Sequence, residues 1–404
     1  MSTTSGLPEN LARFRKSRNL SQEELAEAAN LGVDTIGRIE RGERQATRPA
    51  TLRKLAQALR LPIGLLMGVA SAASRYDVKR LAALRQAITA SEEIPGLSDF
   101  TDDAELVPLS TLVASTHNAW RSYVAGRNAE LLHDLPCLLV DARRVVHASN
   151  NDENAAAHRL LSAAYRLGSG LTGRLDLDDL AWTSAERALE AARRSDCPEI
   201  ESAISLRYVA WTLVRQNRTD EAERVAVRAA ERIEPRMLDR DPARAGVFGN
   251  LLFNGAVAAL WSGKSARAAD LLTVAHSAAI RSGVDTASEA AIFGPRVAGL
   301  QLVEQAYRTG DPDSAFRLAE SVPRSQGQVP AFWEAGHRLI LAASAVQLHK
   351  DKLALDYLAE ARDLAPEWSR HQPLGRSTMR ALVDRAARRQ TKRFAELAAH
   401  YSIV

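Results

Sequence analysis

The chain has 404 residues and a net charge of +4; 46% of its residues are hydrophobic, 25% are charged and 5% are aromatic. At roughly 100–200 residues per domain, this length suggests two to four domains. Alanine, leucine and arginine are abundant and alternating β-branched runs are scarce, which favours helices and argues against a sheet-based fold. The N-terminus lacks a signal-peptide core and no stretch approaches the length that crosses a bilayer, so we expect a cytoplasmic protein.

The positive charge is concentrated at the N-terminus. Residues 1–75 hold 12 of the 53 Lys and Arg but 7 of the 49 Asp and Glu, which leaves 41 against 42 in the rest. Such an excess is expected where one segment alone meets a polyanion, although a solvated face often carries as much.

Residues 20–40 are predicted to form two short helices joined by a tight turn. Ser21 with Glu24 three positions later is a capping box, and Asn30 tolerates the left-handed backbone that ends a helix. A second helix can start after Gly32. The apolar residues expected to face a core are Leu25, Ala28, Ala29, Ile36 and Ile39. Two such helices make a helix-turn-helix unit, with the small Ala26 where they cross.

Residues 7–68 resemble the lambda-repressor-like, or XRE-type, DNA-binding domains. The stretches that carry the resemblance are LARFRKSRNLSQEELAEAA, TIGRIERGER and TLRKLAQALRLPIGLLMG. The resemblance implies a five-helix layout, in which the last two helices hold Leu52, Leu55, Leu59, Leu65 and Leu66. It also implies that Val33 to about Glu40 is a recognition helix that enters the major groove of DNA.

The resemblance further implies roles for single residues of this helix. Those facing base edges would be Val33, Asp34, Gly37 and Arg38, and those at phosphates Gln22, Thr35, Arg41 and Arg44. Arg38 best suits guanine, because its planar fork matches the O6 and N7 acceptors. Asp34 either accepts from a cytosine amino group or, as we prefer, favours the helix N-terminus. Arg15 and Glu40 occupy positions that form an ion pair in related domains.

Three residues depart from the usual pattern of that family. The turn commonly has Gly where this chain has Asn30, and Ser or Thr caps the recognition helix where this chain has Gly32. Gly37 lies inside the helix and costs it about 1 kcal/mol relative to Ala. Three explanations for Gly37 are open: close approach of the helix to the DNA backbone, a helix that becomes ordered only on binding, or neutral drift.

The remainder is predicted to be a helical-repeat domain over residues 109–404, after a linker and connecting helix at residues 71–108. Turn residues recur at intervals of 46, 47 and 40 residues: Asn217, Gly263, Gly310 and Lys350. Five positions after them stand mostly small residues: Ala222, Ala268, Ala315 and Leu355. The intervals exceed the roughly 34 residues of a tetratricopeptide repeat, so we interpret the array as a degenerate tetratricopeptide-like α-solenoid.

The predicted fold class is therefore all-α: a five-helix lambda-repressor-like domain followed by a tetratricopeptide-like α-solenoid. This arrangement resembles XRE-type regulators with helical-repeat domains from high-GC bacteria. It is more distantly similar, by architecture rather than motif, to the peptide-sensing RRNPP quorum regulators.

No motif points to catalysis, a cofactor or a metal. GSGLTG at residues 168–173 matches G-x-G-x-x-G, but a helix precedes it where a dinucleotide site needs a strand, so we interpret it as an inter-helix loop. The acidic run at residues 176–179 lacks the calcium-loop pattern, and the histidines are scattered. Cys137 and Cys197 lack metal-type spacing, and we expect both to be buried thiols in a reducing compartment.

A ligand site is expected on the concave face of the array, lined by the first helix of each pair. The candidate residues are Arg207, Tyr208, Trp211, Asn250, Asn254 and Arg296. Asn250 and Asn254 share one helical face and can clamp a peptide backbone or a small polar ligand. The alternative is that they bond to neighbouring helices and that the aromatic residues are core.

The predicted function is a homodimeric, sequence-specific, non-enzymatic transcription regulator that binds a near-palindromic double-stranded DNA operator and senses a small molecule or peptide. The alternative is a DNA-tethered scaffold for protein–protein interaction that takes no small ligand.

Overall fold

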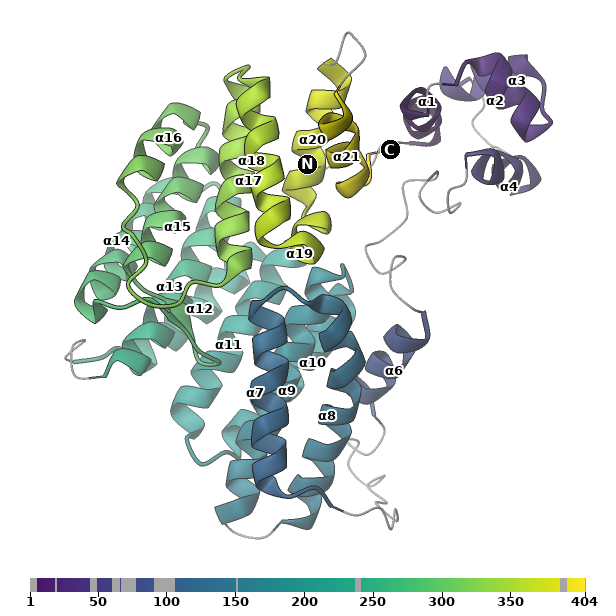
Figure 1. Ribbon diagram of the computed structural model, residues 1–404. Helices are drawn as coiled ribbons and strands as arrows, with labels where there is room; N and C mark the ends of the chain where they lie inside the picture. Colours follow the sequence, from purple (N-terminus) through teal and green to yellow (C-terminus); the bar gives the residue numbers. More distant parts are fainter. Residues whose placement is uncertain are drawn as a thin grey trace. The chain divides into compact units, whose positions relative to one another are not determined.

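The computed structural model describes residues 6–18, 20–43, 49–59, 66, 78–90, 106–149, 152–236, 241–385 and 391–403. The chain divides into two compact units, residues 1–75 with 379–404 and residues 76–378. Among the described residues, the regular elements are helices and one short hairpin, which confirms the all-α prediction (Figure 1).

The N-terminal segment forms the head, which we define as α1 (Leu7–Ser17), α2 (Gln22–Ala29), α3 (Val33–Glu40) and α4 (Pro49–Ala58). Apolar residues from every one of these helices form its core: Leu11, Phe14, Leu25, Ala26, Ala29, Ile36, Ile39, Leu52, Leu55, Ala56, Leu59 and Leu66. Ala28 is exposed, so the prediction that it shares the buried face of α2 is wrong; Ala26 lies there instead. Leu65 of the predicted fifth helix lies outside the described residues.

The ends of α2 follow the predicted chemistry. The Ser21 amide donates to Glu24 Oε2 at 2.7 Å, and the Glu24 amide donates to Ser21 Oγ at 3.1 Å. Asn30 closes the helix with a left-handed backbone at φ 49°. The capping box and the turn are both confirmed, and together they fix where α3 begins.

The second unit begins with α6 (Val78–Ile88) and continues as a stack of paired helices (Figure 1). The pairs are α7 (Leu109–Val124) with α8 (Asn128–Ala148), α9 (Asp152–Arg174) with α10 (Asp178–Arg193), α11 (Pro198–Arg215) with α12 (Thr219–Ile233), α13 (Pro242–Trp261) with α14 (Ser265–Ser282), α15 (Pro295–Arg308) with α16 (Pro312–Ser321), and α17 (Ala331–Gln347) with α18 (Asp351–Leu364). The chain goes on through α19 (Pro366–Arg370), α20 (Pro373–Arg385) and α21 (Lys392–His400).

One left-handed residue joins the two helices of each pair. These residues are Gly126, Asp176, Asn217, Gly263, Gly310 and His349. The next amide then donates to the carbonyl five residues back, as from Arg218 to Leu213 at 2.8 Å, which satisfies a carbonyl at the helix end. Three predicted turn residues are correct and the fourth is shifted by one, since His349 rather than Lys350 is left-handed.

This shift restores the pattern of small residues. Five positions after His349 stands Ala354 rather than Leu355. Ala222, Ala268, Ala315 and Ala354 are all fully buried, as expected of small residues at contacts between helices.

Two other expectations about the array are wrong. GSGLTG is not a loop but the last part of α9. Its glycines leave room for neighbouring side chains to contact the surface of that helix. A Cβ on Gly170 would lie 2.7 Å from the Tyr123 ring, and one on Gly173 would lie 2.3 Å from the Trp211 ring. Cys137 and Cys197 are exposed rather than buried, because they face outward from α8 and from the start of α11.

The sequence also gave no sign of the hairpin of β1 (Thr286–Ala287) and β2 (Ile292–Phe293), which pair antiparallel. In addition, α13 is long and apolar enough to span a membrane, contrary to expectation. Since 72% of its apolar window is buried among neighbouring helices, it is placed as the core helix of the array.

Candidate functional site

The outer face of α3 is the first candidate site. Val33 is 40% exposed, and the side chains of Asp34 and Arg38 are 79% and 59% exposed. Ile36 and Ile39 bury the opposite face in the core of the head. The helix is therefore anchored on one side and presents an apolar, an acidic and a basic side chain on the other.

The exposed basic residues of this face make only ion pairs that are easily exchanged. Arg38 lies 3.5 Å from Asp34 and 3.9 Å from Glu43, and Arg41 Nε donates to Glu43 at 2.6 Å. Exposed pairs of this kind are weak in water. Both guanidinium groups can therefore leave their carboxylates for a base edge or a phosphate.

A largely buried hydrogen-bond network connects the C-terminal end of α3 to α1 and α2. Arg15 donates through Nε and Nη2 to the two carboxylate oxygens of Glu40, at 2.7 and 2.9 Å. Gln22 Nε2 donates to Glu40 as well, at 2.7 Å. The phosphate contact expected of Gln22 stays a prediction. Burial alone would raise the pKa of Glu40, but the hydrogen bonds from Arg15 and Gln22 outweigh it and hold that pKa below its usual value.

Gly37 does not lie on the exposed face that the sequence analysis expected. It is buried, and a Cβ there would lie 3.0 Å from Arg41 Nη1 and 3.5 Å from Gln22 Oε1. Glycine thus lets two side chains close over the helix, a reason that the sequence alone did not suggest. Thr35 is half-buried in the first turn of α3, and Arg44 lies outside the described residues.

A cavity of about 520 Å³ in the second unit is the second candidate site. It is lined mainly by the first helices of the pairs, as expected. The predicted residues that line it are Arg207, Tyr208, Trp211, Asn250 and Asn254. Arg296 is not among its lining residues: its guanidinium donates to Glu334 at 2.8 Å and to the Pro323 carbonyl at 2.7 Å, which ties α15 to α17.

Aromatic residues are concentrated around this cavity. Those that line it are Tyr123, Tyr208, Trp211, Phe253, Trp261, Phe332, Trp333 and Trp368. Four of the six tryptophans of a chain with 5% aromatic residues therefore meet at one place. Of these aromatic residues, only Tyr208 and Trp211 were predicted from the sequence. The recurrence of aromatic residues on the first helices of successive pairs would have indicated the others.

The two asparagines of α13 serve the fold as well as the cavity. Asn250 is buried and its amide donates to the Ile292 carbonyl of β2, while Asn254 donates to the Asn250 carbonyl at 2.9 Å. The amide groups of both asparagines therefore bond within the fold, as the alternative interpretation from the sequence predicted. Both residues nevertheless line the cavity.

Four arginines bring positive charge to the cavity. Arg215 pairs with Asp176 at 3.0 Å, and Arg308 pairs with Glu304 at 2.7 Å. Arg207 lies over the Tyr208 ring at 4.1 Å. Arg174, which was not predicted as a site residue, lies 3.7 Å from the Tyr123 ring centre and 4.5 Å from that of Phe332.

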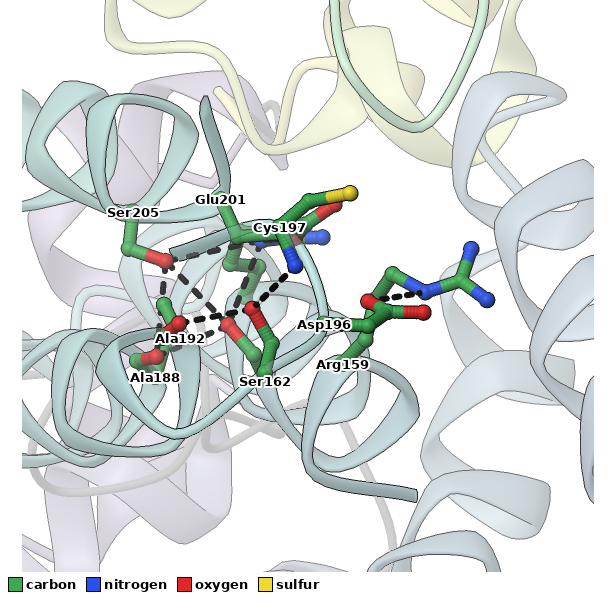
Figure 2. A network of polar contacts seen from close by, with 10 residues as sticks. Arg159, Ser162, Ala188, Ala192, Asp196, Cys197, Glu201 and Ser205 are labelled. Carbon is green, nitrogen blue, oxygen red and sulfur yellow. Dashed lines mark hydrogen bonds and ion pairs between the residues drawn. The ribbon is translucent and has the colours of Figure 1, made fainter. Parts of the chain in front are cut away.

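A separate polar network holds α9, α10 and α11 together (Figure 2). Arg166 donates to Glu201 at 2.6 Å. Ser162, which Figure 2 labels, donates to the Ala188 carbonyl at 2.7 Å. Both side chains of the ion pair are almost fully buried, so the network orients α11, which carries much of the cavity wall. Among the described residues, no group of three or more His, Cys, Asp or Glu side chains is placed to hold a metal.

Comparison with known proteins concerns the head. Residues 11–66 match the helix-turn-helix family model. The HTH-type transcriptional repressor RghR of Bacillus subtilis (strain 168) is 41% identical over 59 residues, which are 15% of this chain and 44% of that protein. The uncharacterized HTH-type transcriptional regulator RghRB of the same organism is 38% identical over 60 residues, 15% of this chain and 43% of that protein. The chain thus spans less than half the length of these relatives.

Solved structures are similar over more of the chain at low identity. Bacillus thuringiensis PlcR in complex with the peptide PapR7 and DNA has a TM-score of 0.37 and 11% identity, over 78% of this chain and 93% of that one. A Rap protein complexed with Competence and Sporulation Factor has a TM-score of 0.44 and 13% identity, over 73% and 88%. Residues 11–66 of this chain are an XRE-type helix-turn-helix domain, and they precede a region of tetratricopeptide-like helical pairs.

Proposed function

We propose that this protein is a cytoplasmic transcription regulator that reads DNA through α3 and senses a small molecule or peptide through its helical pairs. The observation that carries the proposal is the exposed trio of Val33, Asp34 and Arg38 on the second helix of a matched helix-turn-helix. Residues 1–70 are then the DNA-binding domain, residues 71–108 a linker with a connecting helix, and residues 109–404 the sensing or dimerising domain.

Base reading in this proposal rests on Arg38. Its guanidinium exchanges Asp34 and Glu43 for the O6 and N7 acceptors of a guanine, which its planar fork fits. Val33 supplies an apolar contact to a thymine methyl group. Thr35, Arg41 and Arg44 contact phosphates, which fix the position of the head without reading sequence.

The protein acts as a homodimer in this proposal. Two recognition helices then read half-sites about 34 Å apart, and the operator is near-palindromic. The helix-turn-helix match gives the head a non-enzymatic role, so regulation rather than chemistry is the output.

The cavity supports a sensor rather than a scaffold that takes no ligand. Its volume of about 520 Å³ lies within the roughly 300–1,000 Å³ of small-ligand sites. A ligand that binds one arrangement of the dimer better than another shifts the population toward it, and operator affinity follows.

The test begins with DNA fragments selected from the source genome by the full-length protein. In a gel-shift assay, Arg38→Ala is expected to relax base preference at one operator position, at a cost of about 1–3 kcal/mol, because it removes a bidentate base contact. Arg41→Ala is expected to weaken binding to all sequences alike, because phosphates are common to all of them.

The matched control is Arg80→Ala, which removes an exposed arginine of α6 in the other unit and should leave binding unchanged. If Arg38→Ala retains both the affinity and the base preference of the unmodified protein, α3 is not the reading helix.

A further inference from the structure

The arginines of the cavity differ in what neutralises them. Arg215 pairs with Asp176 at 3.0 Å and with Asp178 at 2.6 Å, so this cation is already satisfied. Among the described residues, no carboxylate lies within ion-pair distance of Arg207, and its Nε is buried without a hydrogen-bond partner.

Arg174 brings a second guanidinium to the same end of the cavity. It is 8% exposed and packs between the Tyr123 and Phe332 rings. Its Nη1 donates to the Tyr123 carbonyl at 3.0 Å and to Asn128 Oδ1 at 3.4 Å. These contacts and the two rings fix the orientation of the guanidinium.

Both arginines act electrostatically on the same side chain, Tyr123. Burial raises the pKa of Tyr123, and the positive charges of Arg174 and Arg207 both oppose that rise. One end of the cavity is therefore positive and poorly solvated, where a negative ligand group is favoured.

The rest of the cavity wall suits a flat apolar group. Trp211, Trp261, Trp333 and Trp368 all contribute to it. Aromatic rings of this kind pack well against a planar unsaturated body in stacked or edge-on geometry. The cavity thus combines a positive end with an aromatic interior.

We propose that this cavity binds an organic carboxylate, whose flat apolar body lies among the tryptophans and whose acid group accepts hydrogen bonds from Arg174 and Arg207. Guanidinium and carboxylate form short, charge-assisted pairs, and Arg207 lines the cavity with a guanidinium that no described carboxylate neutralises. A small aromatic acid and the C-terminal residue of a short peptide share this chemistry. The inference deepens the proposed sensing function and rests on it for its regulatory meaning only.

The experiment compares two acids with their neutral amides on the full-length protein. The probe pairs are phenylacetate with phenylacetamide, and glycylphenylalanine with glycylphenylalanine amide. Binding is followed by tryptophan fluorescence, excited at the red edge where no probe absorbs. In at least one pair the acid is expected to bind more tightly by about tenfold or more, the factor that one lost charged hydrogen bond produces. The pair that discriminates identifies a free acid or a peptide end as the source.

The variant Arg207→Met keeps the length of the side chain and removes its charge, so it is expected to abolish the preference for the acid. Arg218→Met is the matched control, because Arg218 also packs on a tryptophan, 5.1 Å from the Trp182 ring, outside the cavity. The inference is overturned if no probe binds, if acids and amides bind equally, if the preference survives Arg207→Met, or if Arg218→Met also removes it. No DNA is present, so this outcome is independent of the gel-shift test of the proposed function.

Discussion

Glu40 links α3 to the two helices that precede it. It is the last residue of α3, and its carboxylate receives hydrogen bonds from Arg15 on α1 and Gln22 on α2. Its side chain is 7% exposed and that of Arg15 is 12% exposed, so neither charge can be fully hydrated if the other is lost. One carboxylate therefore links α1, α2 and α3 behind the exposed face of α3.

The first residue-scale prediction concerns this carboxylate. Glu40→Gln is expected to destabilise the head by about 2–3 kcal/mol at neutral pH, because it leaves the Arg15 guanidinium without its charged partner. The folded-state pKa of Glu40 is lowered, so its contribution is complete above the unfolded pKa of about 4.3 and is lost as the pH falls through the folded value. The difference between the two proteins should therefore vanish in acid.

The measurement is a urea titration of the full-length protein, followed by the methyl signals of Ile36 and Ile39 in the head core. Tryptophan fluorescence reports only residues 120–368, where all six tryptophans lie, and should show an unchanged transition. Glu43→Gln is the matched control, since Glu43 makes only exposed pairs with Arg41 and Arg38. Equal midpoints for Glu40→Gln and Glu43→Gln would contradict this account of the network.

What the sequence could predict at this scale follows from local chemistry. Ser21, Glu24 and Asn30 act on backbone groups a few residues away, so their types and spacing were enough. The engagement of Gln22 by Glu40 joins residues 18 positions apart, and the burial of Gly37 depends on how the long side chain of Arg41 folds back. Neither can be seen before the helices are placed.

At the scale of elements, the turns explain which parts of the array were predictable. Gly263, Gly310 and Asn217 favour the left-handed backbone, so their positions were visible in the sequence. Asp176 and His349 take the same left-handed backbone although their residue types predict it less clearly. At these turns the next amide donates to the carbonyl five residues back, and this hydrogen bond requires that backbone. The hairpin of β1 and β2 was missed because each strand has only two residues.

The glycines of α9 support an element-scale prediction. Gly173→Ala would gain up to about 1 kcal/mol of helix propensity, but its Cβ would lie 2.3 Å from the Trp211 ring. Overpacking of this kind costs about 1–3 kcal/mol, so a net loss of stability is expected, with a change in native tryptophan fluorescence as Trp211 moves.

The measurement is urea unfolding of the full-length protein followed by that fluorescence. Gly255→Ala in α13 is the matched control, since its Cβ would meet Leu271 and Val227 at an ordinary 3.4 Å. If Gly173→Ala is as stable as Gly255→Ala and keeps the native spectrum, the glycines of α9 do not position the cavity wall.

At the scale of the whole molecule, charge and aromatic residues are segregated. The positive excess lies in residues 1–75, whereas every tryptophan lies between residues 120 and 368. Composition along the chain therefore indicates the separate roles that we propose for the head and the array. It did not reveal Arg174 as a cavity residue, because that required knowing that GSGLTG continues a helix up to Arg174.

This segregation allows coupling between DNA binding and ligand binding to be measured from both ends. If the array senses a ligand and thereby alters operator affinity, linkage requires the operator to alter ligand affinity by the same factor. Coupling of about 1–3 kcal/mol is typical, which is a factor of roughly 5–150.

The probe acid that binds most tightly is titrated by tryptophan fluorescence with and without operator DNA, and operator affinity is measured by gel shift with and without that acid. Two equal factors above one establish a sensor. If the acid binds and the operator binds but neither changes the other, the array takes the ligand without reporting it to the head, and the sensing part of the proposed function falls while DNA reading by α3 stands.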